Sequence, residues 1–129
     1  MSSLKIPLIM VAITIIFIGF AVWTQHSLAT SAEKLEQSLS NLESAIKNDN
    51  WEMANEELES FTRLWGKNKN SWQIFINHEE IDNIDATLAR VKQLVNLKAK
   101  ADSLSEISAL RLFIVHIPQK ESLCLVNIL

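Results

Sequence analysis

An uninterrupted apolar segment from Ile6 to Val22, flanked by Lys5 and Trp23, constrains this chain more than any other feature. It contains no charged side chain. As a helix it would span about 26 Å, at about 1.5 Å per residue, which is close to the hydrocarbon core of a bilayer at about 30 Å. We therefore expect a short cytoplasmic N-terminus at residues 1–5, a transmembrane helix over residues 6–23, and an extracytoplasmic domain over residues 24–129.

A cleaved signal peptide is the alternative interpretation of this segment. Ser27–Ala29 and Thr30–Ala32 both have the small-x-small pattern of a cleavage site. The apolar segment is longer than the roughly 7–15 residues usual in a signal peptide, which favours an uncleaved anchor. Because Lys5 precedes the segment and no charge follows it until Glu33, the positive-inside rule predicts the N-terminus inside and the domain outside the cytoplasmic membrane.

Charge and composition exclude several classes of protein. The net charge is −3, so there is no basic surplus to bind a phosphate backbone, and we expect no nucleic-acid partner. Only two Gly and two Pro occur in 129 residues, and such scarcity of turn-forming residues favours long helices. The single cysteine, Cys124, excludes an internal disulfide and a cysteine-rich zinc site.

Apolar residues spaced three and four apart predict helices with one buried stripe each. The first stripe comprises Leu28, Ala32, Leu35, Leu39, Leu42 and Ile46. The second comprises Trp51, Ala54, Leu58, Phe61 and Trp65, and the third Ile74, Ile81, Ile84, Leu88, Val91 and Val95. This pattern predicts an all-α fold, with the transmembrane helix followed by a three- or four-helix antiparallel bundle that has coiled-coil-like seams.

Cap and turn residues predict where these helices begin and end. Thr30 and Glu33 match a capping box that would start the first bundle helix, and residues 48–50 would end it. Residues 66–70, beginning with Gly66, are the clearest predicted loop, with a new helix from Ser71.

Further along, a break is expected near residues 100–103, where Ser103 and Glu106 form another capping box. Pro118 is expected to end the final helix at Ile117. The apolar tail over residues 121–129 would then pack back onto the bundle, or dock on a partner or on the membrane surface.

One cluster has metal-ligand chemistry. On a helix, His78, Asp82 and Asp85 share one face and could hold a divalent cation. The spacing matches neither H-E-x-x-H nor the E-x-x-H pair of di-iron bundles, so a solvated acidic face is the favoured interpretation. We therefore expect no metal and no cofactor.

The remaining candidates for chemistry are better explained by packing. Trp51, Trp65 and Trp72 lie at multiples of seven residues, which suits core packing better than an aromatic ligand pocket. Cys124 has no histidine nearby in the sequence, and His116 is the one candidate to meet it in space. We expect no catalytic residue and no enzyme activity.

Three segments carry a resemblance: the N-terminal anchor, the stretch from Trp72 through His78 to Asp85, and the ending from Ile117 to Leu129. Together they resemble a family of uncharacterised small bacterial proteins, anchored by their N-termini in the membrane and found mostly in spore-forming Gram-positive lineages. The family is defined only as a domain of unknown function. The resemblance implies a membrane-anchored helical protein without an assigned activity. It marks His78, Glu79, Asp82, Asp85 and Asn127 as a possible interaction surface.

The expected function is a non-enzymatic interaction or accessory module at the cell envelope. Its partners would be the lipid bilayer, through the N-terminal helix, and another membrane or envelope protein, with self-association left open. Two alternatives remain: a ligand-sensing domain of a membrane complex, and a metal-binding protein that uses the His78 cluster.

Overall fold

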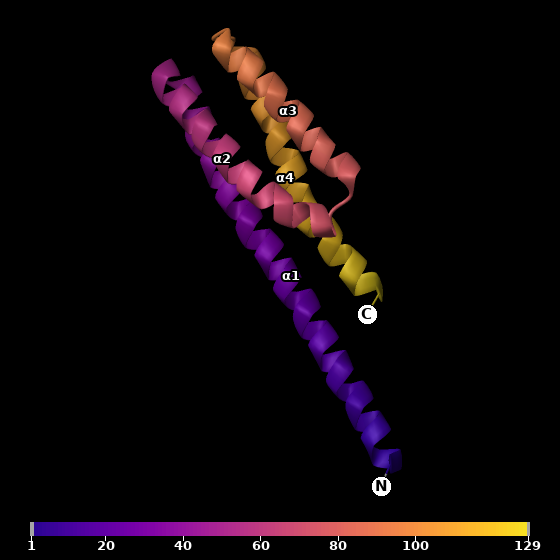
Figure 1. Cartoon of the computed structure of the whole chain (residues 1–129). Coiled ribbons are helices and arrows are strands. Elements are labelled where there is room, and N and C mark those ends of the chain that lie inside the picture. Colours follow the sequence, from indigo (N-terminus) through magenta and orange to yellow (C-terminus); the bar gives the residue numbers. More distant parts are fainter. Residues whose placement is uncertain (1, 129) are drawn as a thin grey trace.

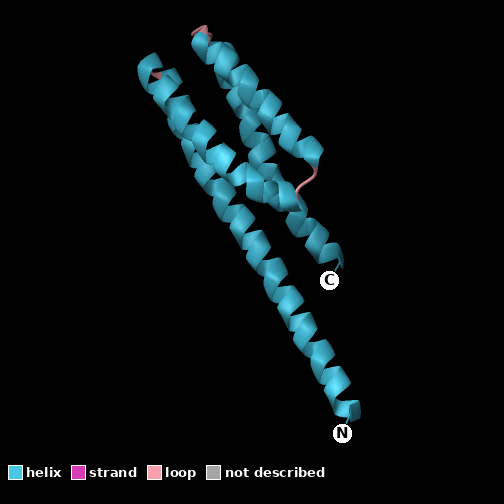
Figure 2. Cartoon of the chain, viewed as in Figure 1, coloured by secondary structure: helices cyan, strands magenta, loops and turns pink. Residues whose placement is uncertain are grey.

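Four helices joined by short turns form the described chain (Figure 1). The structure is a computed structural model that describes residues 2–128, with side chains described for residues 3–118. The helices are α1 (Ser2–Lys47), α2 (Trp51–Phe75), α3 (His78–Asn96) and α4 (Lys100–Ile128). No strand occurs within residues 2–128, which confirms the predicted all-α fold (Figure 2).

The helices form an antiparallel bundle around one apolar core. Helix α1 packs against α2 and α4, and α3 packs against the same two helices. The N-terminal half of α1 extends well beyond the other three helices (Figure 1). The prediction of a long apolar first helix followed by a helical bundle is therefore confirmed.

Helix α1 joins the apolar segment to the bundle without a break. The prediction of a new helix capped by Thr30 is wrong, because Thr30 lies inside α1 and its Oγ1–H donates to the carbonyl oxygen of His26 at 2.9 Å. No Gly or Pro separates Trp23 from the first buried stripe, so nothing in the backbone interrupts the helix. Pro7, near the N-terminus of α1, is accommodated within the helix.

The first half of α1 is exposed, whereas one face of its second half is buried in the bundle. Every large apolar side chain described from Leu4 to Trp23 is exposed, whereas Leu28 and the stripe that follows it are buried. Within the described residues, α1 is the one helix long and apolar enough to cross a membrane. An exposed apolar surface of this size is rare on a protein surrounded by water, and usually marks contact with a membrane or another protein.

The predicted stripes form the core. All six positions from Leu28 to Ile46 are buried, as are the predicted positions from Ala54 to Trp65 on α2 and from Ile81 to Val95 on α3. Helix α4 completes the core with Ile107, Leu110, Ile114 and Ile117. Burial of each such aliphatic side chain contributes about 1.5–3 kcal/mol, so these seams are the main stabilising contacts of the bundle.

The predicted loop at residues 66–70 is wrong. Helix α2 continues through Gly66 to Phe75, and the chain turns instead at Ile76 and Asn77. Trp72, seven residues after Trp65, extends the buried stripe across the segment, and its packing outweighs the cost of about 1 kcal/mol for one glycine inside a helix. Because the third helix begins at His78 rather than near Ser71, Ile74 lies at the end of α2 and is 76% exposed instead of buried.

Two turns use a left-handed residue that is not glycine. Asp49, after α1, has φ 56°, and Lys98, after α3, has φ 54°. At the first turn, the Asp49 N–H donates to the carbonyl of Ile46 and the Asn50 N–H to that of Ala45, the two bonds of a Schellman motif. The turn after α3 has the same bond pattern around Lys98.

The start of α4 partly matches the prediction. The expected break is present, but α4 begins at Lys100, and the Ser103 N–H donates to the carbonyl oxygen of Ala99 at 2.9 Å. Ser103 is therefore a buried residue inside the helix and not its cap.

Helix α4 also continues through Pro118, so the predicted end at Ile117 is wrong. Proline inside a helix removes one backbone donor at a cost of about 3 kcal/mol. Buried Ile114 and Ile117 hold the preceding turn against the core, and the Gln25 side-chain amide donates to the Pro118 carbonyl oxygen at 2.8 Å. Residues 121–128 are consequently part of α4 and not a separate tail, and their side chains lie outside those described.

We predict that Gly66→Ala raises the free energy of unfolding by about 0.5–1 kcal/mol, because Gly66 is helical and an added Cβ would meet no atom within 4 Å. Lys98→Gly should stabilise by a similar amount, since glycine adopts positive φ without steric cost. Urea unfolding of the full chain in detergent micelles, followed by tryptophan fluorescence, measures both changes. A destabilising Gly66→Ala would indicate that residues 66–70 form a turn after all.

Candidate functional site

The candidate site lies where the end of α2 and Pro118 of α4 meet α1 at the edge of its apolar half, with the start of α3 next to the end of α2. We call this end of the molecule the base of the bundle. The ring of Phe75 lies 6.4 Å from the ring of Phe20, which in turn lies 6.1 Å from that of Trp23. With the hydrogen bond from Gln25 to Pro118, these contacts fix the bundle to the exposed apolar segment.

Two adjoining hollows lie between α1 and the end of α2. One, of about 300 Å³, is lined by polar side chains such as Ser27 and Asn68 and by apolar ones that include Trp23 and Trp72. The other, of about 220 Å³, is lined mainly by Phe17, Phe20, Leu28 and Phe75. None of the described residues lining either hollow is His, Cys, Asp, Glu, Lys or Arg, so they offer contact surface but no acid–base group.

Trp65 and Trp72 form the aromatic part of the core beside these hollows. Their rings pack edge to face at 87°, with centroids 5.5 Å apart. Trp72 is 1% exposed, and its indole N–H has no hydrogen-bond partner among the described residues. Trp51 is half-buried at the far end of α2. The three tryptophans therefore do not line one common pocket, which supports the interpretation of their spacing as core packing.

The predicted surface residues occupy the start of α3. Asn77 caps the helix, because its side-chain oxygen accepts a hydrogen bond from the Glu79 N–H at 3.1 Å. His78 is the first helical residue, and it is exposed together with Glu79 and Asp82. Acidic side chains here also interact favourably with the positive end of the helix dipole, which is a sufficient structural reason for their presence.

Asp85 does not belong to this exposed surface. Its Oδ1 accepts a hydrogen bond from the Trp65 indole N–H at 2.8 Å, and its Oδ2 lies 2.6 Å from Lys69 Nζ. Both partners are on α2, so Asp85 connects α2 to α3. Among the described residues, no three His, Cys, Asp or Glu side chains come close enough to hold a metal ion, and His78, Asp82 and Asp85 are not brought together as ligands.

Asn127 and Cys124 lie in the part of α4 whose side chains are not described, although their backbone is helical. The contribution of Asn127 to a surface stays a prediction, and whether Cys124 meets the exposed His116 stays open.

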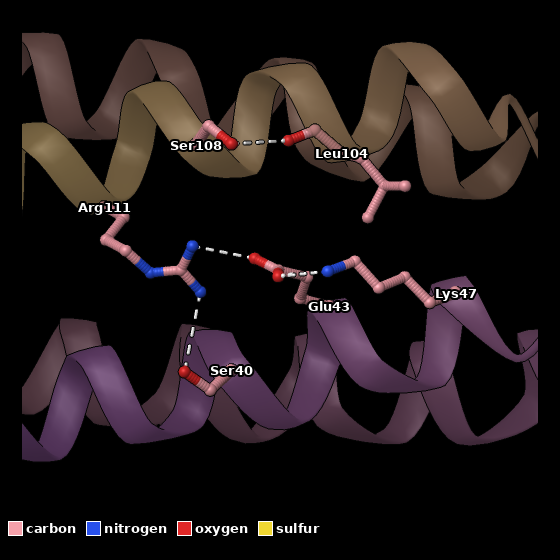
Figure 3. Close-up of polar contacts among 6 residues, drawn as sticks. All are labelled: Ser40, Glu43, Lys47, Leu104, Ser108 and Arg111. Atoms are coloured by element: carbon pink, nitrogen blue, oxygen red, sulfur yellow. Dashed lines mark hydrogen bonds and ion pairs between the residues drawn. The ribbon is translucent and has the colours of Figure 1, made fainter.

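A second polar network lies in the upper half of the bundle and connects α1 to α4 (Figure 3). Glu43 lies 2.9 Å from Lys47 Nζ and 2.7 Å from Arg111 Nη1, and the other terminal nitrogen of Arg111 lies 3.5 Å from Ser40 Oγ. Hydrogen bonds from Lys47 and then Arg111 hold the pKa of the Glu43 carboxyl below its ordinary value of 4.5. The network stabilises the packing of α4 on α1.

Sequence reasoning missed the contacts that define the base. The contacts made by Gln25, Phe75 and Lys69 do not follow from the sequence pattern, because that pattern predicts a loop at residues 66–70 and two separate helices within α1. The seven-residue interval from Trp65 to Trp72 was the signal that could have shown α2 to be continuous, and with it the pairing of Lys69 with Asp85.

We predict that Asp85→Asn lowers the free energy of unfolding by about 1–3 kcal/mol, since it removes the partner charge of Lys69 and weakens the acceptor for the buried Trp65 indole. His78→Ala is the matched control on the same helix and should change stability by less than about 0.5 kcal/mol, because His78 is exposed. Urea unfolding measures both. Equal losses would place His78 in a buried network.

We predict that Glu43→Gln is destabilising by about 1 kcal/mol at pH 7, and that this difference shrinks at about pH 3. The folded-state pKa of Glu43 lies below 4.5, so its stabilising contribution is present above that value and is lost as the pH falls through the lowered pKa. Glu59→Gln, at an exposed carboxyl on α2, is the matched control and should change stability at pH 7 by less than about 0.5 kcal/mol. A difference that stays constant between the two pH values would argue against this role of Glu43.

Comparison with known proteins identifies a family but no activity. No curated protein matches the chain, and no solved structure matches it. A family model does match, over residues 22–128, which include the buried half of α1 and all of α2, α3 and the described part of α4. The chain therefore belongs to the family described as Domain of unknown function (DUF4363).

Proposed function

We propose that this protein is a non-enzymatic interaction or accessory module, held at the outer face of the cytoplasmic membrane by α1. In this proposal α1 crosses the membrane once, with its N-terminus in the cytoplasm, and the bundle binds another membrane or envelope protein.

The observation that carries the proposal is the continuity of α1. The exposed apolar residues from Leu4 to Trp23 and the buried stripe from Leu28 to Ile46 belong to one helix. A bilayer would cover the first set, and the bundle covers the second. Since no hinge separates them, the base of the bundle would stand directly on the membrane surface.

The same continuity argues against removal of a signal peptide. Cleavage after Ala29 or Ala32 would remove Leu28, and in the second case Ala32 as well, from the apolar core. It would also remove Gln25, which donates to Pro118. Both cleavage points fall inside residues 22–128, the region that the family model matches. An uncleaved anchor keeps the core intact.

The chemistry of the base supports an interaction role over catalysis. The hollows beside α1 are lined by described residues without titratable groups, and Asp85 is engaged by Trp65 and Lys69. The exposed residues His78, Glu79 and Asp82 at the start of α3 offer an acidic surface at the same end of the molecule. A partner that approaches this surface close to the lipid would itself be a membrane protein with basic groups near the interface.

Topology is the measurement that tests this proposal. In a Cys124→Ser background, Asn48→Cys places a single thiol in the exposed turn after α1, at the end of the bundle opposite to the base. We expect a membrane-impermeant maleimide to label it in intact cells. In the same background, Ser3→Cys should be labelled only after the cells are permeabilised, because it precedes the apolar segment.

The reverse labelling pattern, with Ser3→Cys reactive in intact cells and Asn48→Cys protected, would place the bundle in the cytoplasm and overturn the proposal. Loss of the Ser3→Cys label from the membrane-bound chain, accompanied by a shorter polypeptide, would show that a signal peptide is removed.

A further inference from the structure

The end of α4 reaches beyond the base of the bundle. Helix α4 runs antiparallel to α1 and continues past the ends of α2 and α3 in the direction of the N-terminus of α1 (Figure 1). The hydrogen bond from Gln25 to the carbonyl of Pro118 sets the relative heights of the two helices. Ile128 lies ten residues after Pro118, so at about 1.5 Å per residue it lies about 15 Å lower, near the level of Ile15.

Both helices become apolar at the same height. In α1, no charged residue lies between Lys5 and Glu33. In α4, the last charged residues are Lys120 and Glu121, which the same register places near Val22 and Trp23, where the apolar segment of α1 ends. Below that level α4 continues as Leu123-Cys-Leu-Val-Asn-Ile128, which contains one polar residue. Two helices of opposite direction thus change from polar to apolar residues at one level.

The end of α2 is apolar at this level too. Phe75 contacts Phe20, and Ile74 is 76% exposed although it is a large aliphatic residue. The start of α3 then returns to polar residues with Asn77, His78 and Glu79. The base is therefore apolar around α1 and is bordered by polar groups, as expected of a surface that rests in a membrane.

We propose that the last turns of α4, from Leu123 to Ile128, are inserted beside α1 among the acyl chains of the leaflet that faces the bundle, and that Ile74 contacts the same leaflet. The inference rests on the proposed function, because it requires α1 to span the membrane. A helix can enter lipid because its backbone donors and acceptors are paired within the helix. At the level of Ile15, Ile128 would lie about halfway along the apolar segment of α1, so residues 123–128 would enter one leaflet and would not reach the other.

Nitroxide accessibility in the full chain tests this inference. Cys124 is the only cysteine, so it is labelled directly, and Leu123, Leu125 and Val126 are each replaced by cysteine in a Cys124→Ser background. Four consecutive positions sample every face of a helix with 3.6 residues per turn. The proteins are reconstituted in vesicles of phosphatidylcholine and phosphatidylglycerol, and collision with oxygen is compared with collision with a water-soluble nickel chelate.

We expect the oxygen-to-nickel ratio at all four positions to be several-fold higher than at Ser105→Cys, an exposed position in the upper part of α4. Ala12→Cys, in the apolar half of α1, is the reference for a position inside the membrane. Tail positions that resemble Ser105→Cys, while Ala12→Cys resembles a lipid-embedded site, would overturn the inference and leave the anchor in place. A low ratio at Ala12→Cys itself would overturn both the inference and the proposed function.

Discussion

The unbroken backbone hydrogen-bonding of α1 is the constraint on which the rest of the structure depends. One helix of 46 residues carries an exposed apolar surface over its first half and a buried leucine seam over its second. No glycine or proline lies between Trp23 and Leu28, where a kink could form. The orientation of the exposed half is therefore fixed relative to the bundle. Helices α2 and α4 both pack on the second half, and α3 is held by them and does not pack directly on α1.

Polar contacts specify how these helices are arranged around α1. Glu43 binds Arg111 and so connects α4 to α1, whereas Asp85 binds Trp65 and Lys69 and so connects α3 to α2. The apolar seams supply most of the stabilisation, but seams of aliphatic residues tolerate sliding and repacking. Directional bonds at two heights reduce that freedom. Both acidic residues are therefore occupied by partners on neighbouring helices.

Much of this fold could be predicted from apolar spacing alone, because a stripe such as Leu35, Leu39 and Leu42 can be buried only on one face of a helix. The errors came from local signals that tertiary packing outweighed. Gly66 and Pro118 each disfavour a helix by a few kcal/mol at most, and buried neighbours such as Trp72 and Ile117 offset that cost. The site was less predictable: the sequence placed Asp85 on a face with His78, but only the packing of α2 against α3 could show that it binds Lys69.

The length of α1 also sets the distance between the membrane surface and the far end of the bundle. If Trp23 marks the bilayer surface, Lys47 is 24 residues further along the helix, or about 36 Å away. Lys100 Nζ lies 3.1 Å from Asp49 Oδ1 at that far end, where it holds the turns of the two helical hairpins together. A soluble or wall-associated molecule could meet this far end without approaching the lipid. In the proposed topology, only a molecule that is itself in the membrane could meet the opposite end, so the two ends of the bundle would select partners from different compartments.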